Sequence, residues 1–288
     1  MALIPGILPP SRETYEAAVY YFQFFPLITA AQWLTPYNPM GKTSIESRLN
    51  LPGKLAWAVM ETPGLAIVGY SILTLPQQLG VANQLTWANY TMAGLYCAHY
   101  VYRAWLCPLL APSMSPIHAL PFLMACGFNI LNGISIAGWT AGYGPLGQAD
   151  WGHNAVFRLE IGMVLWGWSL LANIFHDDDL REIRRAAGRI QKEKAERDGG
   201  KVEGVDKVYM LPKNGLFKLV LYPHYFCEWC EWAGFWIIGG WGCTPARTFL
   251  INEISTMLPR ALSGKQWYEE KFGKERVGNR KAVIPGIL

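Results

Sequence analysis

The 288-residue sequence contains few charged residues. Lys, Arg, Asp and Glu make up 16% of it, against about 25% in ordinary soluble domains. The stretches 62–102 and 104–149 contain none of these four residue types. Uncharged apolar runs of about 18 residues or more are typical of helices that cross a membrane. This shortage of charge argues against a soluble protein and predicts an all-α polytopic membrane protein.

Other signals are also missing. The six cysteines are scattered through or beside apolar stretches, so they predict no disulfide framework. The net charge of +4 comes from a few connections rather than from a basic binding face, so no nucleic-acid partner is expected. The first apolar segment lacks a basic leader and a small-residue cleavage site, which favours a retained membrane anchor over a signal peptide.

The apolar pattern predicts about seven transmembrane helices in one membrane-embedded domain, residues 1–288. The expected spans are 14–34, 55–75, 87–107, 116–138, 156–176, 224–242 and 245–262. Such a protein would contact membrane lipid over most of its surface.

Basic residues are unevenly divided among the connections between these spans. The connections 41–54 and 177–213 and the tail 263–288 are rich in Lys and Arg, whereas 76–86 and 139–155 contain neither. Because basic loops stay on the cytosolic side, 177–213 is expected to be a cytosolic loop and 263–288 a cytosolic tail. Seven spans then place the N-terminus in the lumen and the C-terminus in the cytosol.

Costly polar residues interrupt the spans in clusters. Glu61 lies in "AWAVMETP" (56–63), and "YCAHYVYRAW" (96–105) contains Tyr100 and Arg103. Polar groups inside a membrane usually face a cavity, a partner or a ligand. A tyrosine hydroxyl beside a carboxyl group or a cation suits the polarisation of a carbonyl. The alternative is that these residues join helices or form an interfacial tyrosine belt.

A third cluster, "NIFHDDDLREIRR" (173–185), places Asn173, Asp177 and Arg184 on one side of a helix that leaves the membrane. Arginine forks match phosphate geometry. Basic residues are also favoured at helix C-termini by the helix dipole, but that explanation does not account for the apolar surroundings of Asn173.

The fourth cluster, "YPHYFCEWCEW" (222–232), contains a C-x-x-C pair. A zinc site would need a second pair of ligands, and a thioredoxin-like site would need a βαβ setting; the sequence offers neither. On a helix His224, Cys227, Glu228 and Glu231 form one stripe. We therefore expect no metal, and interpret the stripe as the wall of a ligand cavity.

In their order along the chain, these clusters resemble the steroid 5α-reductase family of membrane ene-reductases. The resemblance covers about residues 40–288. It is carried by "LPGKLAWAVMETP" (51–63), "CAHYVYRAW" (97–105), "FNILNG" (128–133), "NIFHDDDLREIR" (173–184), "YMLPKNGLFKLVLYPHYFCEWCEW" (209–232) and "WYEEKFGKERVGNRKAVIPGIL" (267–288).

The resemblance implies a multi-pass enzyme of the endoplasmic reticulum membrane that uses NADPH. Such enzymes reduce a carbon–carbon double bond conjugated to a carbonyl in a hydrophobic substrate taken from the bilayer, typically a 3-oxo-Δ4 steroid. Glu61 and Tyr100 match the residues that hold the substrate carbonyl and stabilise enolate charge on its oxygen. The positions matching the cofactor site are Arg103, Asn129, Asn173, Asp177, Arg184, Tyr209, His224, Glu228 and Tyr268.

Met210 follows Tyr209 where an arginine is common in the family, so phosphate recognition would depend on other basic residues such as Arg103 and Arg184. Met60 stands where the steroid enzymes usually carry glutamine, which leaves the substrate open. A polyprenal or a trans-2-enoyl-CoA of lipid metabolism is therefore an alternative substrate. Isoprenylcysteine-type membrane methyltransferases have similar C-terminal helices but should lack the pair of Glu61 and Tyr100. A further alternative is a helical bundle without enzymatic activity, in which the polar residues only join the helices.

Overall fold

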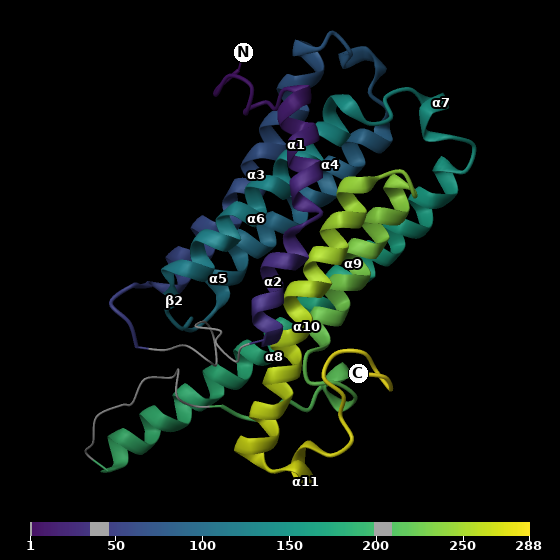
Figure 1. The fold of residues 1–288 in the computed structure, drawn as a ribbon. Helices are drawn as coiled ribbons and strands as arrows, with labels where there is room; N and C mark the ends of the chain where they lie inside the picture. Colours follow the sequence, from purple (N-terminus) through teal and green to yellow (C-terminus); the bar gives the residue numbers. More distant parts are fainter. Residues whose placement is uncertain (1, 35–45, 199–208) are drawn as a thin grey trace.

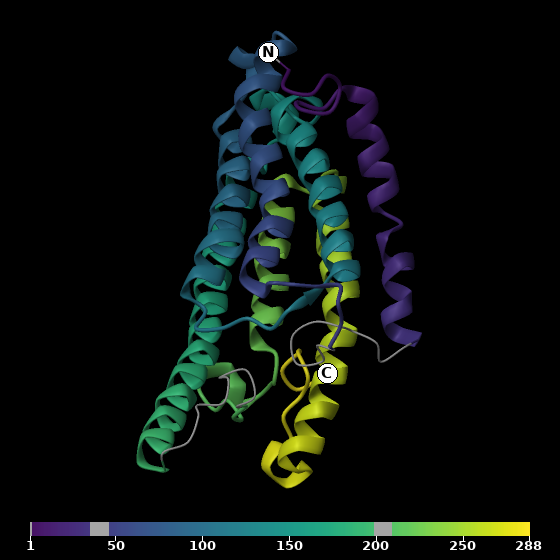
Figure 2. The same ribbon diagram turned by 90° about the vertical axis from the view of Figure 1, so that its left-hand side faces the viewer.

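A computed structural model describes residues 2–34, 46–198 and 209–288 of the chain (Figure 1). Lys42, the segment 199–208 of the predicted cytosolic loop and the start of the family resemblance at residue 40 lie outside these residues. The described chain forms an elongated bundle of helices, with the N-terminus near one end and the C-terminal tail toward the other (Figures 1 and 2).

The predicted all-α class is confirmed for the described residues. The longer helices are α1 (Arg12–Phe22), α2 (Phe25–Leu34), α3 (Gly53–Gln78), α4 (Trp87–Tyr100), α6 (Ala119–Gly138), α8 (Ala155–Asp198), α9 (Pro223–Gly239) and α10 (Thr244–Phe272). The short ones are η2 (Ala82–Gln84), η3 (Val101–Leu106), α5 (Cys107–Leu110), η4 (Trp139–Tyr143), α7 (Gln148–Trp151), η6 (Gly215–Lys218) and α11 (Lys274–Val277). Two strands, β1 (Asn50–Leu51) and β2 (Ile117–His118), form an antiparallel pair.

Three helices of the described chain are long and apolar enough to cross a membrane: α3, α6 together with η4, and α8. Each of the other predicted spans also coincides with helical structure. The segment 14–34 is split between α1 and α2, α9 has 17 residues, and α10 includes charged residues such as Glu253. The helices α1, α2 and α9 are therefore too short to count as membrane spans by length, and α10 is not apolar enough. The number of crossings stays a prediction.

Close helix contacts are made at glycines. A Cβ atom added at Gly162 of α8 would lie 2.7 Å from the carbonyl oxygen of Gly234 on α9, and one added at Gly234 would lie 2.7 Å from that of Gly162. Small residues let the backbones of membrane helices approach closely. This contact holds α8 and α9 together, and both helices carry predicted cofactor residues.

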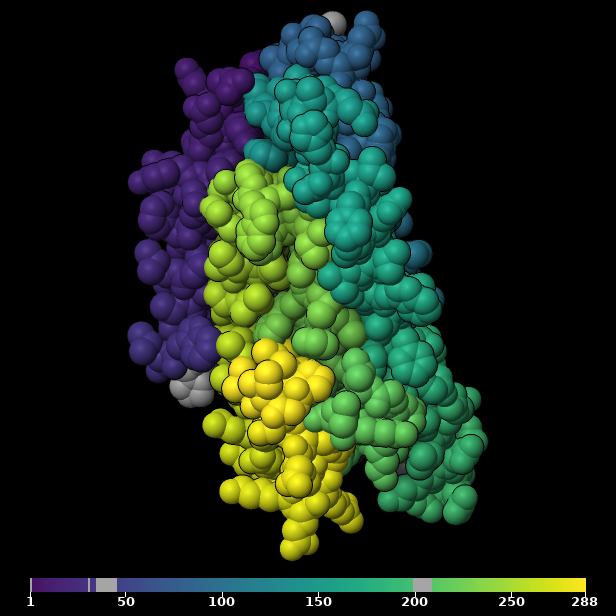
Figure 3. Space-filling view, turned by 90° about the vertical axis from the view of Figure 1, so that its right-hand side faces the viewer, coloured from purple at the N-terminus to yellow at the C-terminus, as the bar shows by residue number. Residues whose placement is uncertain are grey.

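Two segments leave the bundle at the end where the C-terminus lies. The second half of α8 carries most of the charged residues of that helix and projects beyond the other helices (Figure 1). The tail after α11 folds back against the residues that precede α9, where Val220 and Lys281 form a parallel bridge. Figure 3 shows this tail in yellow on the outer face of the molecule, beside the green segment that leads into α9.

Candidate active site

A cavity of about 230 Å³ lies among α2, α3, α4, α6, α9 and α10. Its apolar walls come mainly from α2 and α6, with Met60 and Trp57 on α3. The polar side chains that line it are Thr29, Gln32, Glu61, His99, Tyr100, Arg103, Asn129, Glu228, Glu253, Thr256 and Arg260. A mostly apolar pocket with a few convergent polar groups is typical of a small-molecule site. Five of the predicted site residues therefore meet here: Glu61, Tyr100, Arg103, Asn129 and Glu228.

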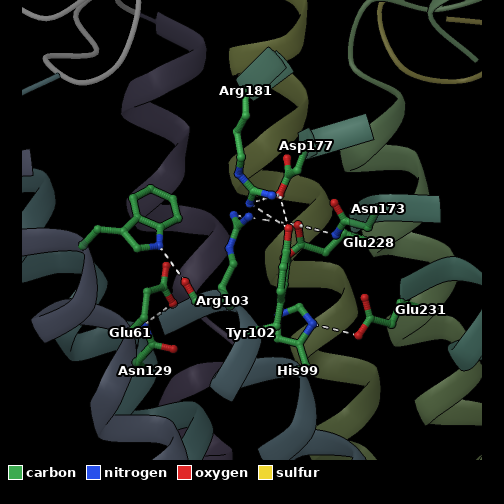
Figure 4. Close-up of polar contacts among 11 residues, drawn as sticks. Glu61, His99, Tyr102, Arg103, Asn129, Asn173, Asp177, Arg181, Glu228 and Glu231 are labelled. Atoms are coloured by element: carbon green, nitrogen blue, oxygen red, sulfur yellow. Dashed lines mark hydrogen bonds and ion pairs between the residues drawn. The ribbon is translucent and has the colours of Figure 1, made fainter. Parts of the chain in front are cut away.

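Glu61 is held by the neighbouring helix α6. The Asn129 amide donates a hydrogen bond to Glu61 Oε2 at 3.1 Å (Figure 4). It also donates to the Met60 carbonyl oxygen at 2.9 Å. Across the cavity wall, Trp57 Nε1 donates to the Arg103 carbonyl oxygen at 3.0 Å, and the Arg103 guanidinium lies 4.9 Å from the centre of the Trp57 ring. These contacts fix the position of the carboxylate and of the cation relative to one another.

Tyr100 is buried at the last residue of α4. Its ring centre lies 4.6 Å from that of Tyr96, one helical turn earlier, and the Tyr96 hydroxyl accepts a hydrogen bond from Asn132 Nδ2 at 3.1 Å. Gly64 leaves the room that this hydroxyl needs, because a Cβ atom there would lie 2.5 Å from Tyr96 Oη. The helix then continues as the π-helical segment η3, which carries Arg103. π-Helical turns occur frequently at functional sites.

On the opposite side of the cavity, a buried network joins α4 and the following segment η3 to α8 and α9. His99 Nδ1 lies 2.7 Å from Glu231 Oε1, and His99 Nε2 lies 3.8 Å from Glu228 Oε1 (Figure 4). Glu228 Oε2 is 3.8 Å from Arg103, and it accepts a hydrogen bond from Asn173 Nδ2 at 3.5 Å. Asn173 is thereby tied to the cavity wall through Glu228. The stripe on α9 is only partly a cavity wall, since Glu231 turns toward His99.

Two further predicted residues belong to contacts between α8 and the region of η3. Asp177 Oδ2 accepts a hydrogen bond from the Tyr102 hydroxyl at 3.3 Å, and the same hydroxyl accepts one from Arg181 at 2.8 Å (Figure 4). Arg184 donates to the Ser113 carbonyl oxygen at 3.1 Å. Both residues lie beside the network rather than among the described residues that line the cavity.

Tyr209, His224 and Tyr268 gather in a separate aromatic cluster. Tyr268 is buried, with its ring centre 6.3 Å from that of Tyr222, while Tyr209 packs against Trp267 at 4.9 Å. His224 is the second residue of α9, and its ring centre lies 4.7 Å from that of Tyr225. Burial raises the pKa of Tyr268 above its ordinary value, so its hydroxyl stays neutral. The predicted cofactor set is thus divided between the cavity and this cluster.

The sequence did not single out the part of the site that α10 supplies. Glu253, Thr256 and Arg260 line the cavity from successive turns of this helix. Glu253 and Arg260 both lie within the predicted span 245–262 but belong to none of the four polar clusters of the sequence. The three residues are spaced three and four apart along the chain, so they share one face of a helix. That spacing is the sequence signal that could have identified them.

Several buried polar atoms of the cavity wall find no hydrogen-bond partner among the described residues. They are Gln32 Oε1, Asn129 Oδ1, Thr256 Oγ1 and Arg260 Nε. Buried polar groups are nearly always paired, so these atoms point to a polar ligand or to water. Within the described residues no group of three or more His, Cys, Asp and Glu side chains is arranged to hold a metal ion, and the cysteines are free thiols.

The chain is similar to known proteins over most of its length. The pattern of the family described as 3-oxo-5-alpha-steroid 4-dehydrogenase matches residues 113–288. Uncharacterized protein C9.08c of Schizosaccharomyces pombe is 36% identical over 87% of this chain and 91% of its own length. Steroid 5-alpha-reductase DET2 of Arabidopsis thaliana is 31% identical, covering 88% and 87% of the two chains. The 3-oxo-5-alpha-steroid 4-dehydrogenase 1 of Bos taurus is 28% identical, covering 87% and 88%. The chain belongs to the 3-oxo-5-alpha-steroid 4-dehydrogenase family of oxidoreductases.

Proposed function

We propose that the protein reduces the carbon–carbon double bond of a hydrophobic α,β-unsaturated ketone, with NADPH as the reductant. The preferred substrate is a 3-oxo-Δ4 steroid or a sterol-like terpenoid. The observation that carries this proposal is the cavity that brings the carboxylate of Glu61 and the phenol of Tyr100 together with apolar walls. Relatives named as steroid 5-alpha-reductases support the substrate class.

Tyr100 and Glu61 act on the substrate carbonyl. Reduction at the β-carbon leaves negative charge on the carbonyl oxygen, and a hydrogen bond from the Tyr100 hydroxyl stabilises that charge. Asn129 orients Glu61 through the 3.1 Å hydrogen bond. The apolar side chains of α2 and α6 exclude water from the cavity, which strengthens these electrostatic contacts.

The residues present fit a dinucleotide in their chemistry. Arg103 and Arg260 offer cationic donors for phosphate, and the unpaired atoms of Gln32 and Thr256 offer further polar contacts. Arg103, Asn129, Asn173 and Glu228 would hold the cofactor at the cavity. Asp177, Arg184, Tyr209, His224 and Tyr268 complete the proposed set of cofactor-binding residues. When bound, NADPH supplies the hydride for the reduction.

We also propose that the chain crosses the endoplasmic reticulum membrane seven times, with a lumenal N-terminus and a cytosolic C-terminus. The uneven distribution of Lys and Arg supports this orientation, and the number follows from the seven apolar runs of the sequence. The substrate would enter from the bilayer, and NADPH from the cytosol.

A polyprenal or an enoyl-CoA is the second candidate substrate. Met60 favours it, because this buried side chain lines the cavity at the position where the steroid enzymes usually present a glutamine amide. The loss of that amide removes one polar contact for an oxygenated substrate and extends the apolar wall.

The test is a substrate panel. Microsomes that express the chain are supplied with NADPH and with progesterone, a polyprenal or an enoyl-CoA, and the products are analysed by mass spectrometry. We expect one of the three to gain two hydrogens, with the steroid preferred. Normal expression without saturation of any substrate would refute the reductase proposal.

A further inference from the structure

A second concavity lies outside the site described above, where the C-terminal tail folds back on the bundle. It encloses about 360 Å³ and is lined by Lys218, Leu219, Arg276, Val277, Asn279, Arg280, Lys281 and Gly286. Four of these eight residues are cationic and none is acidic. We call it the tail groove.

Most of the positive charge of the tail groove is not neutralised. Lys218, Arg276 and Lys281 form no ion pair with any described residue. Arg280 donates instead to the carbonyl oxygens of Val277, Pro212 and Arg276 at 2.8, 3.0 and 2.6 Å, so it builds the wall of the groove. A set of unpaired cations around one concavity favours an anion with several oxygens, such as a phosphate.

The backbone fixes the tail groove at the start of α9. Lys281 N–H donates to the Leu219 carbonyl oxygen, and Leu221 and Tyr222 N–H donate to the carbonyl oxygens of Lys281 and Ala282, all at 2.9 Å. The predicted membrane span in α9 begins at residue 224, two residues later. The groove therefore lies at the depth where that helix would meet the lipid headgroups.

Exposed apolar side chains border the same groove. Leu219 is 52% exposed, and Ile287, next to Gly286 in the lining, is 74% exposed. A soluble phosphate would gain nothing from these side chains. A phospholipid would, because its phosphate and its acyl chains meet at this level of the bilayer.

We propose that the tail groove binds the phosphate of an anionic phospholipid. Lys218, Arg276 and Lys281 contact the phosphate, while Leu219 and Ile287 contact the start of the acyl chains. Because the groove joins the tail to the segment before α9, the bound lipid stabilises the folded tail against the bundle. This inference rests on the proposed membrane topology but not on the proposed enzymatic activity.

The test measures thermal unfolding of the purified full-length chain in nanodiscs, without NADPH or substrate. Discs of phosphatidylcholine are compared with discs that also contain phosphatidylglycerol. We expect the anionic lipid to raise the unfolding temperature, and high salt to weaken that effect. In the variant Lys218→Gln/Arg276→Gln/Lys281→Gln the lipid-dependent shift should fall to less than half.

Matched controls separate a specific site from general charge. The variant Lys192→Gln/Lys194→Gln/Arg197→Gln removes three cations from the exposed end of α8 and should keep the full shift. The variant Lys218→Arg/Lys281→Arg retains the charge and should also keep it. If the tail-groove triple variant fails to fold, the single variant Lys218→Gln replaces it and should show a smaller shift than wild type.

Three results would overturn the proposal. The first is an equal lipid effect in wild type and in the tail-groove variant. The second is a shift produced by inorganic phosphate in neutral discs that matches the lipid effect and disappears in the variant, which would make the ligand a soluble anion. The third is a shift produced by NADP⁺ that disappears in the variant, which would assign the groove to the cofactor.

Discussion

Tyr100 provides the most direct residue-scale test of the proposed chemistry. Replacing it with phenylalanine removes one hydrogen-bond donor while the ring keeps its packing against Tyr96. Loss of a donor that stabilises an oxyanion typically costs about 10²–10³-fold in kcat. We expect a fall of that size for Tyr100→Phe in a steady-state assay. Tyr90→Phe, at an exposed position of the same helix, should behave like wild type. Full activity of Tyr100→Phe would remove this residue from the mechanism.

The hydrogen-bonded pair of Glu231 and His99 should contribute to stability. Both side chains are buried, and His99 Nδ1 lies 2.7 Å from Glu231 Oε1. Leaving one partner of a buried hydrogen bond unsatisfied typically costs about 1–3 kcal/mol. We therefore expect Glu231→Leu to lower the free energy of unfolding in detergent by roughly that amount. Glu160→Leu, an exposed change on α8, is the matched control and should have a much smaller effect. Equal effects of the two changes would argue against the pair.

At the residue scale, the sequence indicated which residues would be functional better than it indicated where their side chains would point. Glu61, Tyr100, Arg103 and Glu228 were recognisable because polar groups are costly in apolar spans, and the structure places all four at one cavity. Glu231 shares the predicted stripe with Glu228 but turns to His99, a partner 132 residues away in the chain. Helical spacing defines a shared face, but it does not say which neighbouring helix that face meets.

At the scale of elements, the contact between Gly64 of α3 and Tyr96 of α4 should affect the site indirectly, through the position of Tyr100. A Cβ atom at Gly64 would lie 2.5 Å from Tyr96 Oη, so Gly64→Ala must displace Tyr96 and with it the adjacent ring of Tyr100. Overpacking of this kind typically costs about 1–3 kcal/mol. We expect a lower unfolding temperature together with reduced turnover.

The control for this prediction lies in the same helix. At Gly69 the nearest atom to an added Cβ is Cys97 Sγ at 3.9 Å, which is an ordinary contact. Gly69→Ala should therefore retain both the unfolding temperature and the turnover. Should Gly64→Ala match Gly69→Ala in both measurements, the contact would have no role in positioning Tyr100.

The elements themselves were largely predictable, but their breaks were not. Each apolar run became helical, because a charge-free stretch in a membrane can satisfy its backbone only as a helix or a barrel strand. The interruption between α1 and α2 coincides with Pro26 at the start of α2, a residue type that interrupts helices, whereas the π-helical segments η3 and η4 were not expected from the sequence. Sequence periodicity has no signal for a π-turn of five or six residues.

At the scale of the whole molecule, the proposed topology places the two ends of the chain on opposite sides of the membrane. Single-cysteine variants in a cysteine-free background at Leu3 and Ile287, both exposed, should react with a membrane-impermeant thiol reagent from opposite sides of sealed microsomes. The tail should react from outside, the cytosolic side, and the N-terminus only after the vesicles are permeabilised. Reaction of both positions without permeabilisation would contradict seven crossings.

The placement of the cofactor also belongs to this scale. The predicted cofactor residues divide between the cavity and the cluster of Tyr209, His224 and Tyr268, and the gap between the two groups could not be derived from the sequence. Family resemblance alone supplied Tyr209 and Tyr268, and helical spacing also indicated His224, whereas the spatial grouping of Arg260 with Glu228 came only from the fold.

The measurement that tests the central claim most directly follows the transferred hydrogen. Purified protein is incubated with NADPH that carries deuterium at both C4 positions of the nicotinamide and with the enone that the substrate panel identifies. Mass spectrometry and NMR then locate the label in the product. The account predicts one deuterium at the β-carbon of the saturated ketone, with the rate reduced in Tyr100→Phe. A saturated product without label at that carbon, or a label on the carbonyl carbon, would contradict it.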